Sequence, residues 1–163
     1  MNSGKKFETN FKDSVPDNIF YYRFRDGTSA WDGGENSKTR FQARNICDCM
    51  MYDGQYLYLL ELKSHKGVSL PLSVIRQNQI DDLMAASEHA NVVAGLVVNF
   101  AEKESVYFMP IELAEKWYNN GVRKSIPISE FKEKCIEIQG RKLKTNYRYD
   151  IQRFIKDAIQ KLI

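Results

Sequence analysis

The sequence lacks any apolar run long enough to cross a bilayer. Its most apolar segment, residues 92–98, is far shorter than the roughly 20 residues that a transmembrane helix needs. Residues 1–11 carry no apolar run either, so we expect no secretory signal peptide. These absences predict a soluble protein of the cytoplasm with no membrane partner.

The sequence has few cysteines, and their spacing does not suit a disulfide framework. The three cysteines are Cys47, Cys49 and Cys135, an odd number that cannot pair completely. The spacing of Cys47 and Cys49 is tighter than usual zinc ligands have, and no second Cys pair or His-x-His motif accompanies it. We therefore expect reduced thiols rather than disulfides or a structural zinc site.

Charge of one sign is not in large excess. The 24 Lys and Arg residues and 21 Asp and Glu residues leave a net charge of +3, which excludes a polybasic tail. A nucleic-acid partner is allowed if the positive side chains gather on one face. The 163 residues, 43% hydrophobic and without repeats or low-complexity tracts, suit one globular domain spanning residues 1–163.

Hydrophobic periodicity and turn signals predict alternating helices and strands. Expected helices span residues 4–12, 71–88, 111–118, 128–134 and the amphipathic C-terminal stretch from 151. Expected strands span residues 19–24, 46–52, 55–62, 91–100 and 104–109, and Asp53-Gly54 marks a hairpin between the second and third. The glycine-rich, polar residues 26–45 predict a long ordered loop or a flexible flap. This order predicts an α/β domain with a mixed central β-sheet flanked by helices.

Two charged side chains follow an interior strand. Alternate side chains of a strand share a face, so Glu61 and Lys63 point the same way with Leu62 opposite. Across the expected hairpin, Asp48 lies at a similar distance from the turn. Two carboxylates and one ammonium can therefore converge, although burying them is costly unless they are paired.

This set of side chains suits phosphodiester hydrolysis. Mg²⁺ prefers oxygen ligands and usually takes one or two carboxylates, here Asp48 and Glu61, together with phosphate oxygens and waters. Lys63 can orient or deprotonate the attacking water. An ordinary ion pair at the end of a strand is the alternative, because Glu-x-Lys also occurs at Glu130-Phe131-Lys132, where a solvated helical face explains it.

The wider sequence resembles a nuclease family. Asp48, twelve intervening residues and Glu61-Leu62-Lys63 are similar to the PD-(D/E)xK nuclease signature. More closely, the chain resembles RecU-type Holliday junction resolvases, in particular compact phage-type members. The resemblance covers most of the chain and is carried by three segments in order: GKKFE from residue 4, ICDCMMYDGQYLYLLELKSHKG from residue 46 and PLSVIRQNQIDDL from residue 71.

The resemblance implies a restriction-endonuclease-like core, a homodimer, dependence on Mg²⁺ with Mn²⁺ as an alternative, and paired nicking of four-way DNA junctions during recombination and repair. By position, the residues that match the family's active site are Glu8, Asp48, Glu61, Lys63 and Gln79. From the residues alone, Glu8 would be a surface acid. Gln79 would share an inward helical stripe with Leu72, Ile75, Leu83 and Ala86, as a satisfied core amide or as a site residue.

Candidate DNA contacts fall in two basic regions and at isolated positions. The family has a longer stalk-like projection where this chain has residues 26–45. There Trp31 could stack on a base and Lys38, Arg40 and Arg44 could hold phosphates, unless the segment is a solvated loop. The second region is interleaved with tyrosines and could equally be a polar surface. Its members are Arg141, Lys142, Lys144 and Arg148. The isolated positions are Lys66 and Arg76.

Three functions remain open from the sequence. The first is a Mg²⁺-dependent endonuclease that resolves four-way junctions, and the second is a nuclease of the same superfamily that cuts flaps, nicks or a recognition sequence. The third is a DNA-binding module without catalysis, whose acid–lysine set is an ion-pair network. The intact set of Asp48, Glu61 and Lys63 favours the two catalytic functions.

Overall fold

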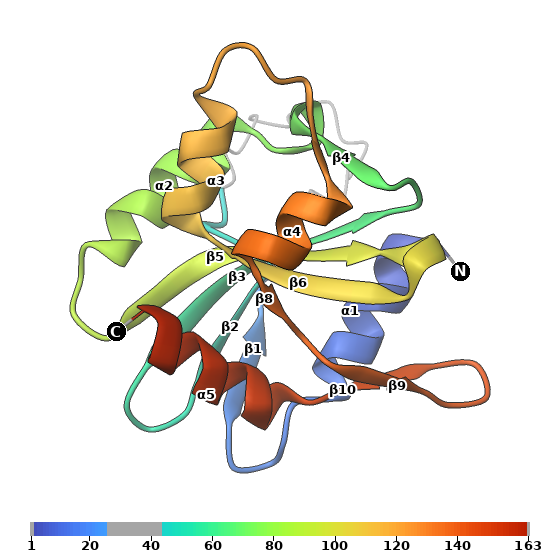
Figure 1. Cartoon of the computed structure of the whole chain (residues 1–163). Coiled ribbons are helices and arrows are strands. Elements are labelled where there is room, and N and C mark those ends of the chain that lie inside the picture. The colour runs from blue at the N-terminus through green and yellow to red at the C-terminus, as the bar shows by residue number, and fades with distance from the viewer. Residues whose placement is uncertain (1, 26–43, 163) are drawn as a thin grey trace, which may run out of the picture.

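The computed structural model describes residues 2–25 and 44–162, and Figure 1 shows their arrangement. The helices are α1 Ser3–Lys12, α2 Gln77–Ser87, α3 Ile111–Tyr118, α4 Ile128–Lys134 and α5 Ile151–Leu162, with short 3-10 turns η1 Leu72–Val74 and η2 Ala101–Lys103. The strands are β1 Phe20–Arg23, β2 Cys49–Tyr52, β3 Leu57–His65, β4 Ser69–Pro71, β5 Val92–Phe100, β6 Ser105–Pro110, β7 Ser125–Pro127, β8 Ile136–Glu137, β9 Gly140–Lys142 and β10 Tyr147–Tyr149.

A mixed sheet forms the centre of the fold. In the described part of the chain its six strands follow the order β1-β2-β3-β5-β6-β8. Strands β3 and β5 are parallel, whereas the other neighbours are antiparallel. Two smaller sheets pair β4 with β7 and β9 with β10. The predicted α/β domain with a mixed central sheet flanked by helices is confirmed.

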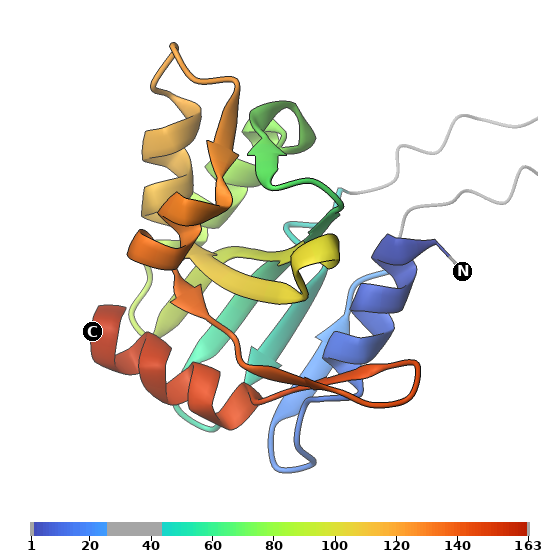
Figure 2. The same ribbon diagram turned by 45° about the vertical axis from the view of Figure 1, so that its right-hand side comes forward.

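Helices cover both faces of the sheet (Figures 1 and 2). Helices α1 and α5 pack on one face through an apolar cluster that includes Phe7, Phe11, Phe154 and Leu62. Helices α2, α3 and α4 pack on the other face through a second cluster that includes Leu83, Trp117, Phe131 and Leu96. Because β3 and β5 lie between these layers, their alternate side chains are buried on both sides, as expected of central strands.

The predicted hairpin forms, but β2 starts three residues later than predicted and β3 starts two residues later, which lengthens the turn. The register places Cys49 opposite Leu60 and Tyr52 opposite Leu57, so residues 53–56 form the connection and the predicted strand starts at 46 and 55 were wrong. One Asp53 carboxylate oxygen accepts from the backbone N–H groups of Gln55 and Tyr56 at 2.8 and 2.7 Å. This Asx-type bonding stabilises the longer loop and replaces the two-residue turn that the sequence favoured.

The start of the helix that follows the hairpin was also predicted wrongly. The expected helix from residue 71 is replaced by β4 and η1, and α2 begins only at Gln77. Leu70 pairs with Ile126 in a ladder that local sequence does not reveal. Leu72 and Ile75 therefore precede the helix and are buried without sharing a helical stripe with Gln79.

The remaining predicted elements are confirmed within a few residues of their ends. These are α1, β1, β5, β6, α3, α4 and α5. In the described part of the chain, no helix is both long and apolar enough to span a membrane.

Candidate active site

Strand β3 delivers Glu61 and Lys63 to one face of the sheet. Leu62, between them, points into the cluster beneath α1 and α5. Glu61 is 5% exposed, and its Oε1 lies 2.8 Å from the Nζ of Lys63. The predicted common face of the two charged side chains is therefore confirmed, and it is the face that α2 covers.

Gln79 closes a triangle with these two residues. Its Nε2 donates to Glu61 Oε1, and its Oε1 accepts from Lys63 Nζ at 3.4 Å. The same Oε1 accepts from the backbone N–H of Arg76 at 3.0 Å, at the first turn of α2. Because one amide bonds both charged partners and the helix start, Gln79 fixes the position of α2 relative to β3. The sequence left Gln79 open as a core amide or as a residue of the site. In the structure, its side chain lies beside Glu61 and Lys63.

Asp48 lies one residue before β2, where strand pairing ends. Its Oδ2 accepts from the backbone N–H of Leu62 at 2.7 Å, in the place where a strand neighbour would offer a carbonyl. Its own backbone carbonyl accepts from Phe24 at 2.9 Å, which ties it to the end of β1. The bond to Leu62 holds the Asp48 carboxylate beside Glu61, as the hairpin predicted, and among the described residues the other carboxylate oxygen has no hydrogen-bond donor.

Burial raises the pKa of Glu61 above its ordinary value of 4.5. The ammonium of Lys63 opposes this shift, and the neighbouring charge of Asp48 adds to it. A buried carboxylate beside a second carboxylate is stabilised by a cation. The donors are carboxylate oxygens, which are the ligands of Mg²⁺ and Mn²⁺. Asp48 and Glu61 therefore fit a hard divalent cation.

The described residues do not add a third ligand of the usual kind. Among residues 2–25 and 44–162, no group of three or more His, Cys, Asp and Glu side chains could hold a metal ion. The nearby Cys47 is buried, and burial raises the pKa of its thiol to about 12, so it remains protonated. All three cysteines are free, as predicted. A cation held by Asp48 and Glu61 would complete its coordination with water and substrate oxygens.

Glu8 lies on α1 and is paired with β1. One of its carboxylate oxygens accepts from Arg23, whose Cα partner in the sheet is Cys49, the neighbour of Asp48. The side chain of Glu8 is 19% exposed. This pairing brings α1 to the Asp48 end of the hairpin, and in the described part of the chain Glu8 bonds Arg23 rather than Asp48, Glu61 or Lys63. Sequence reasoning missed Arg23, whose only signal was a single charge in an aromatic strand.

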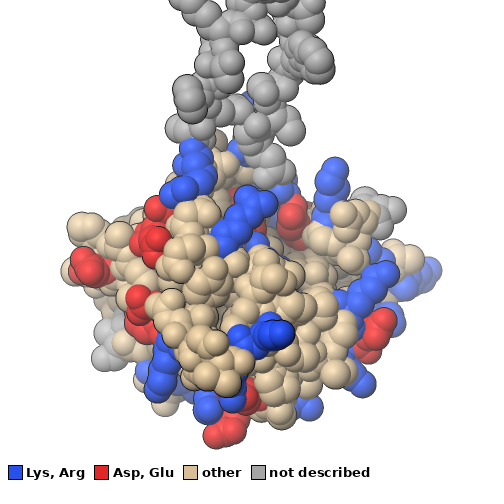
Figure 3. Space-filling view, turned by 90° about the horizontal axis from the view of Figure 1, so that it is seen from above, with Lys and Arg blue, Asp and Glu red and all other residues tan. Residues whose placement is uncertain are grey.

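The predicted DNA contacts near the site differ in their surroundings. Arg44 is exposed and forms an ion pair with Asp82 of α2 at 2.7 Å. Lys66, beyond the end of β3, and Arg76, before α2, are both exposed. Figure 3 shows Lys and Arg side chains spread over the face seen from above, with Asp and Glu among them rather than a band of one sign. Trp31, Lys38 and Arg40 lie outside the described residues.

The second basic region forms a hairpin that the sequence did not predict. Strand β9 carries Arg141 and Lys142, strand β10 carries Arg148, and Lys144 lies in the connection. Lys142 Nζ lies 2.6 Å from Glu104 Oε1, and Arg148 is 3.9 Å from Asp13. Arg141 and Lys144 are exposed. The short polar strands lack the apolar alternation by which strands are recognised in a sequence.

Comparisons with known proteins connect these features to one family. The family model described as "RecU: Recombination protein U" matches residues 17–156. The SPbeta prophage-derived uncharacterized protein YotM of Bacillus subtilis (strain 168) is 34% identical over 178 residues, which cover 98% of this chain and 88% of that protein.

Two more distant similarities are to proteins named as Holliday junction resolvases. RecU of Staphylococcus epidermidis is 26% identical over 116 residues, covering 69% of this chain and 52% of that protein, so the match extends over about half of its length. The structure of Hjc from Archaeoglobus fulgidus, described as a Holliday junction resolvase from an archaeal hyperthermophile, gives a TM-score of 0.49 at 13% identity and covers 74% of this chain and 83% of that one. Because the family model matches most of the sequence, this chain belongs to the RecU family.

Proposed function

We propose that this chain is a divalent-metal-dependent endonuclease that resolves four-way DNA junctions in the cytoplasm. The observation that carries the proposal is the buried Glu61 carboxylate, which contacts Lys63 and Gln79 and lies beside Asp48. Membership of the RecU family and the similarity to a named Holliday junction resolvase support the choice of substrate.

The residues have distinct parts in the proposed hydrolysis. Asp48 and Glu61 would hold Mg²⁺ or Mn²⁺, which supplies an acidified water and offsets charge on the scissile phosphate. Lys63 as an ammonium would orient the attacking water and offset charge on the phosphate, whereas as a neutral amine it would take the proton of that water and become an ammonium. Gln79 holds Glu61 and Lys63 in register, because its amide bonds both. Glu8 acts through Arg23 to position the Asp48 end of the hairpin.

A junction resolvase has to cut two strands. A four-way junction has two-fold symmetry, so a two-fold homodimer would present one active site to each of two matching strands. We therefore propose a homodimer as the working form. Arg44, Lys66 and Arg76, around the start of α2, would contact phosphates flanking the cut, and Arg141, Lys144 and Arg148 would contact DNA farther away.

The test is a gel assay on a synthetic four-way junction and a linear duplex of matched sequence, with Mg²⁺ or with EDTA. We expect symmetric, Mg²⁺-dependent cuts in the junction, which Asp48→Ala abolishes. Asp81→Ala is the matched control, because it removes an exposed carboxylate on the outer face of α2 that accepts a hydrogen bond from Gln77 at 2.7 Å. Equal cutting of both substrates would retain the nuclease and reject the resolvase. Tight binding with no cut in Mg²⁺, or in Mn²⁺ in its place, would reject catalysis.

A further inference from the structure

A cavity lies on the opposite face of the sheet from Glu61 and Lys63. It has a volume of about 140 Å³ and lies between α1, the β5–β6 connection and the β9–β10 hairpin. Ser14 joins two of these elements, because its Oγ accepts from the backbone N–H of Tyr149 at 2.9 Å and donates to the backbone carbonyl of Asn10. The cavity is therefore built by segments from both ends of the chain.

Aromatic rings form its walls. Tyr147 and Tyr149 are nearly parallel, at 10° with centroids 6.3 Å apart, and Phe7 meets Tyr149 edge to face at 5.9 Å. Gly140 lets β9 approach this wall, because a Cβ there would lie 2.8 Å from the Tyr149 ring. Lys142 pairs with Glu104 and lies over the Tyr147 ring, with Nζ 5.9 Å from its centroid. These contacts hold Tyr147 in place at the rim.

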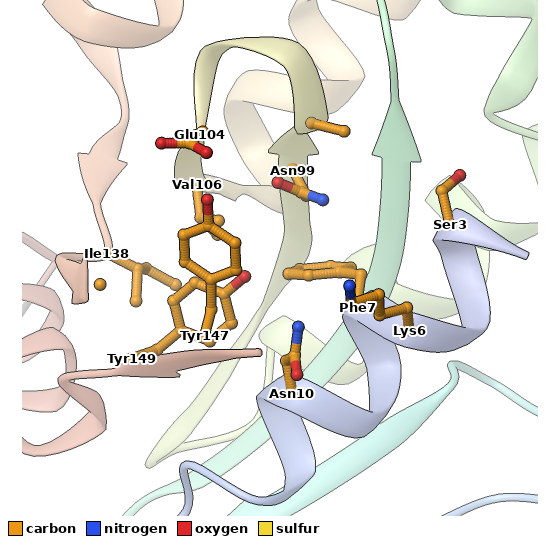
Figure 4. A pocket seen from close by; sticks show the side chains of 12 residues that line it. Ser3, Lys6, Phe7, Asn10, Asn99, Glu104, Val106, Ile138, Tyr147 and Tyr149 are labelled. Carbon is orange, nitrogen blue, oxygen red and sulfur yellow. The ribbon is translucent and has the colours of Figure 1, made fainter. Parts of the chain in front are cut away.

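Polar groups are directed into the same space. Asn10 is only 4% exposed, and its side-chain amide has no hydrogen-bond partner in the described part of the chain. Figure 4 shows this amide pointing into the cavity beside Phe7 and Lys6, with Asn99 on the far side. Asn99 donates to Ser64 Oγ at 3.1 Å, which leaves its carbonyl oxygen to accept. Because the Asn10 amide opens into the cavity and bonds no other side chain or backbone group in the described part of the chain, a ligand in the cavity can bond it.

The size and chemistry point to a planar ring with a polar edge. A protein cavity of about 150 Å³ is known to hold a benzene-sized molecule, and this one is similar in volume. Aromatic walls stack on a flat ring, and an amide offers both a donor and an acceptor to its edge. A pyrimidine base of a DNA strand has this combination, whereas a purine has a second ring to accommodate.

The surroundings suit a base that is still attached to its strand. Exposed Lys5, Lys6 and Lys12 lie along α1, and exposed Arg141 and Lys144 lie on the facing hairpin. Cations on both sides of the opening can hold the phosphates that flank an inserted base. Asn99 also contacts Ser64, the residue after Lys63 in β3. The cavity therefore lies at the same end of β3 as the proposed catalytic lysine, on the reverse side of the sheet.

We propose that this cavity binds one unpaired pyrimidine base of the DNA substrate, with Tyr147 and Phe7 against the ring and Asn10 on its polar edge. The proposal rests on the proposed function, because it takes DNA as the substrate. It adds a base-binding subsite that lies outside the catalytic set and that would hold a strand opened at a branch point.

The test measures binding without cleavage, by the fluorescence anisotropy of short labelled single strands in EDTA. One strand is oligo-dT, the second has the same backbone with abasic sites, and the third is oligo-dA. We expect oligo-dT to bind the unmodified protein about 10-fold more tightly than the abasic strand, as base stacking on aromatic side chains provides. Equal binding of dT and abasic strands would overturn the proposal, and preference for dA would overturn the single-ring assignment.

Matched variants locate the effect. Asn10→Leu and Tyr147→Ala should bring the affinity for oligo-dT close to that for the abasic strand. Asn119→Leu and Tyr22→Ala, at exposed positions on α3's end and on β1, should retain the full preference. Loss in all four variants, or in none, would contradict the assignment. A base preference that persists while Mg²⁺-dependent cutting is absent would reject the nuclease and keep the subsite. Cutting without a base preference would do the reverse.

Discussion

The same Glu-x-Lys pattern occurs twice in this chain, in β3 and in α4, with opposite consequences. In β3, Glu61 and Lys63 share a face and contact each other at 2.8 Å. In α4, residues two apart do not face each other, and Glu130 instead pairs with Arg123 at 2.6 Å and with Lys134, four residues on, at 3.4 Å. Lys132 is exposed. Whether the Glu and Lys of this tripeptide contact each other therefore depends on whether a strand or a helix carries them.

The pKa values of Glu61 and Glu130 are also shifted in opposite directions. Burial raises the pKa of Glu61, with the charge of Asp48 adding to the shift and Lys63 opposing it. The hydrogen bond from Arg123 lowers the pKa of Glu130, helped by the charge of Lys134. A carboxylate kept in an environment that disfavours its charge is typical of a functional site, whereas one stabilised by surface cations is typical of structure.

The largest expected difference is in catalysis by Glu61→Gln and Glu130→Gln. The first change removes a proposed cation ligand that stabilises charge by several kcal/mol, so cleavage should fall at least roughly 10³-fold. The second should leave the rate within about twofold, because surface ion pairs contribute little. Single-turnover cleavage of the four-way junction measures both. Comparable losses in the two variants would remove the distinction between the motifs.

The lysines should differ next. Lys63→Met removes the group that we propose orients or deprotonates the attacking water, which is expected to cost about 10²–10⁴-fold. Lys132→Met is the matched control on the exposed face of α4 and should have no measurable effect. An unchanged rate in that variant would show that the Glu61–Lys63 contact is an ordinary ion pair.

A smaller effect is expected from Gln79→Leu. We propose that the amide acts by positioning Glu61 and Lys63, and such supporting contacts are worth roughly 10–100-fold. We expect kcat to fall more than the affinity for DNA, and Gln79→Glu, which keeps an acceptor but loses the donor to Glu61, to rescue little. Gln77→Leu is the control, because Gln77 bonds Asp81 on the outer face of α2. Loss of DNA affinity with an unchanged kcat would assign Gln79 to binding.

The smallest expected effect is on stability against pH in EDTA. Glu61 has a raised folded-state pKa, so its favourable contribution is complete below 4.5 and is lost as pH rises through the folded value. Glu130 has a lowered folded-state pKa, so its contribution is present above 4.5 and is lost as pH falls through the folded value. Urea unfolding across pH tests these signs.

The readout is a difference in the free energy of unfolding. Subtracting the value for Glu61→Gln from that of the unmodified protein should give a quantity that falls as pH rises above 4.5. The same subtraction with Glu130→Gln should give a quantity that rises as pH approaches 4.5 from below. Slopes of the same sign would contradict the opposite environments of the two carboxylates.

Local patterns predicted the elements whose hydrophobic period is strong. The β2–β3 hairpin, β5 and α5 are of this kind, and the shared face of Glu61 and Lys63 followed from strand alternation alone. The start of α2 was wrong because Pro71 takes part in a strand whose partner lies more than fifty residues away. The β9–β10 hairpin was missed because its strands are short and polar. Pairing between distant segments, as in β4 and β7, leaves no local signal, and short polar strands lack the apolar alternation that reveals a strand.

The site, too, was predicted where local pattern decides and missed where contacts between distant segments decide. The hairpin predicted that Asp48 would lie near Glu61, but its bond to the Leu62 backbone depends on where pairing ends, which the sequence did not fix. The Glu8–Arg23 pair joins a helix to an edge strand and has no signature in spacing. The Asn10 cavity needed the two ends of the chain to meet.

The central claim is that Asp48 and Glu61 hold a divalent cation while Glu130 does not. Isothermal titration calorimetry with Mn²⁺ tests it on the unmodified protein, Glu61→Gln and Glu130→Gln. We expect one saturable site in the unmodified protein and in Glu130→Gln, with an affinity that increases with pH because Glu61 must lose its proton. Glu61→Gln should show no such site. Saturable binding that survives Glu61→Gln unchanged would contradict the assignment of this carboxylate to the metal.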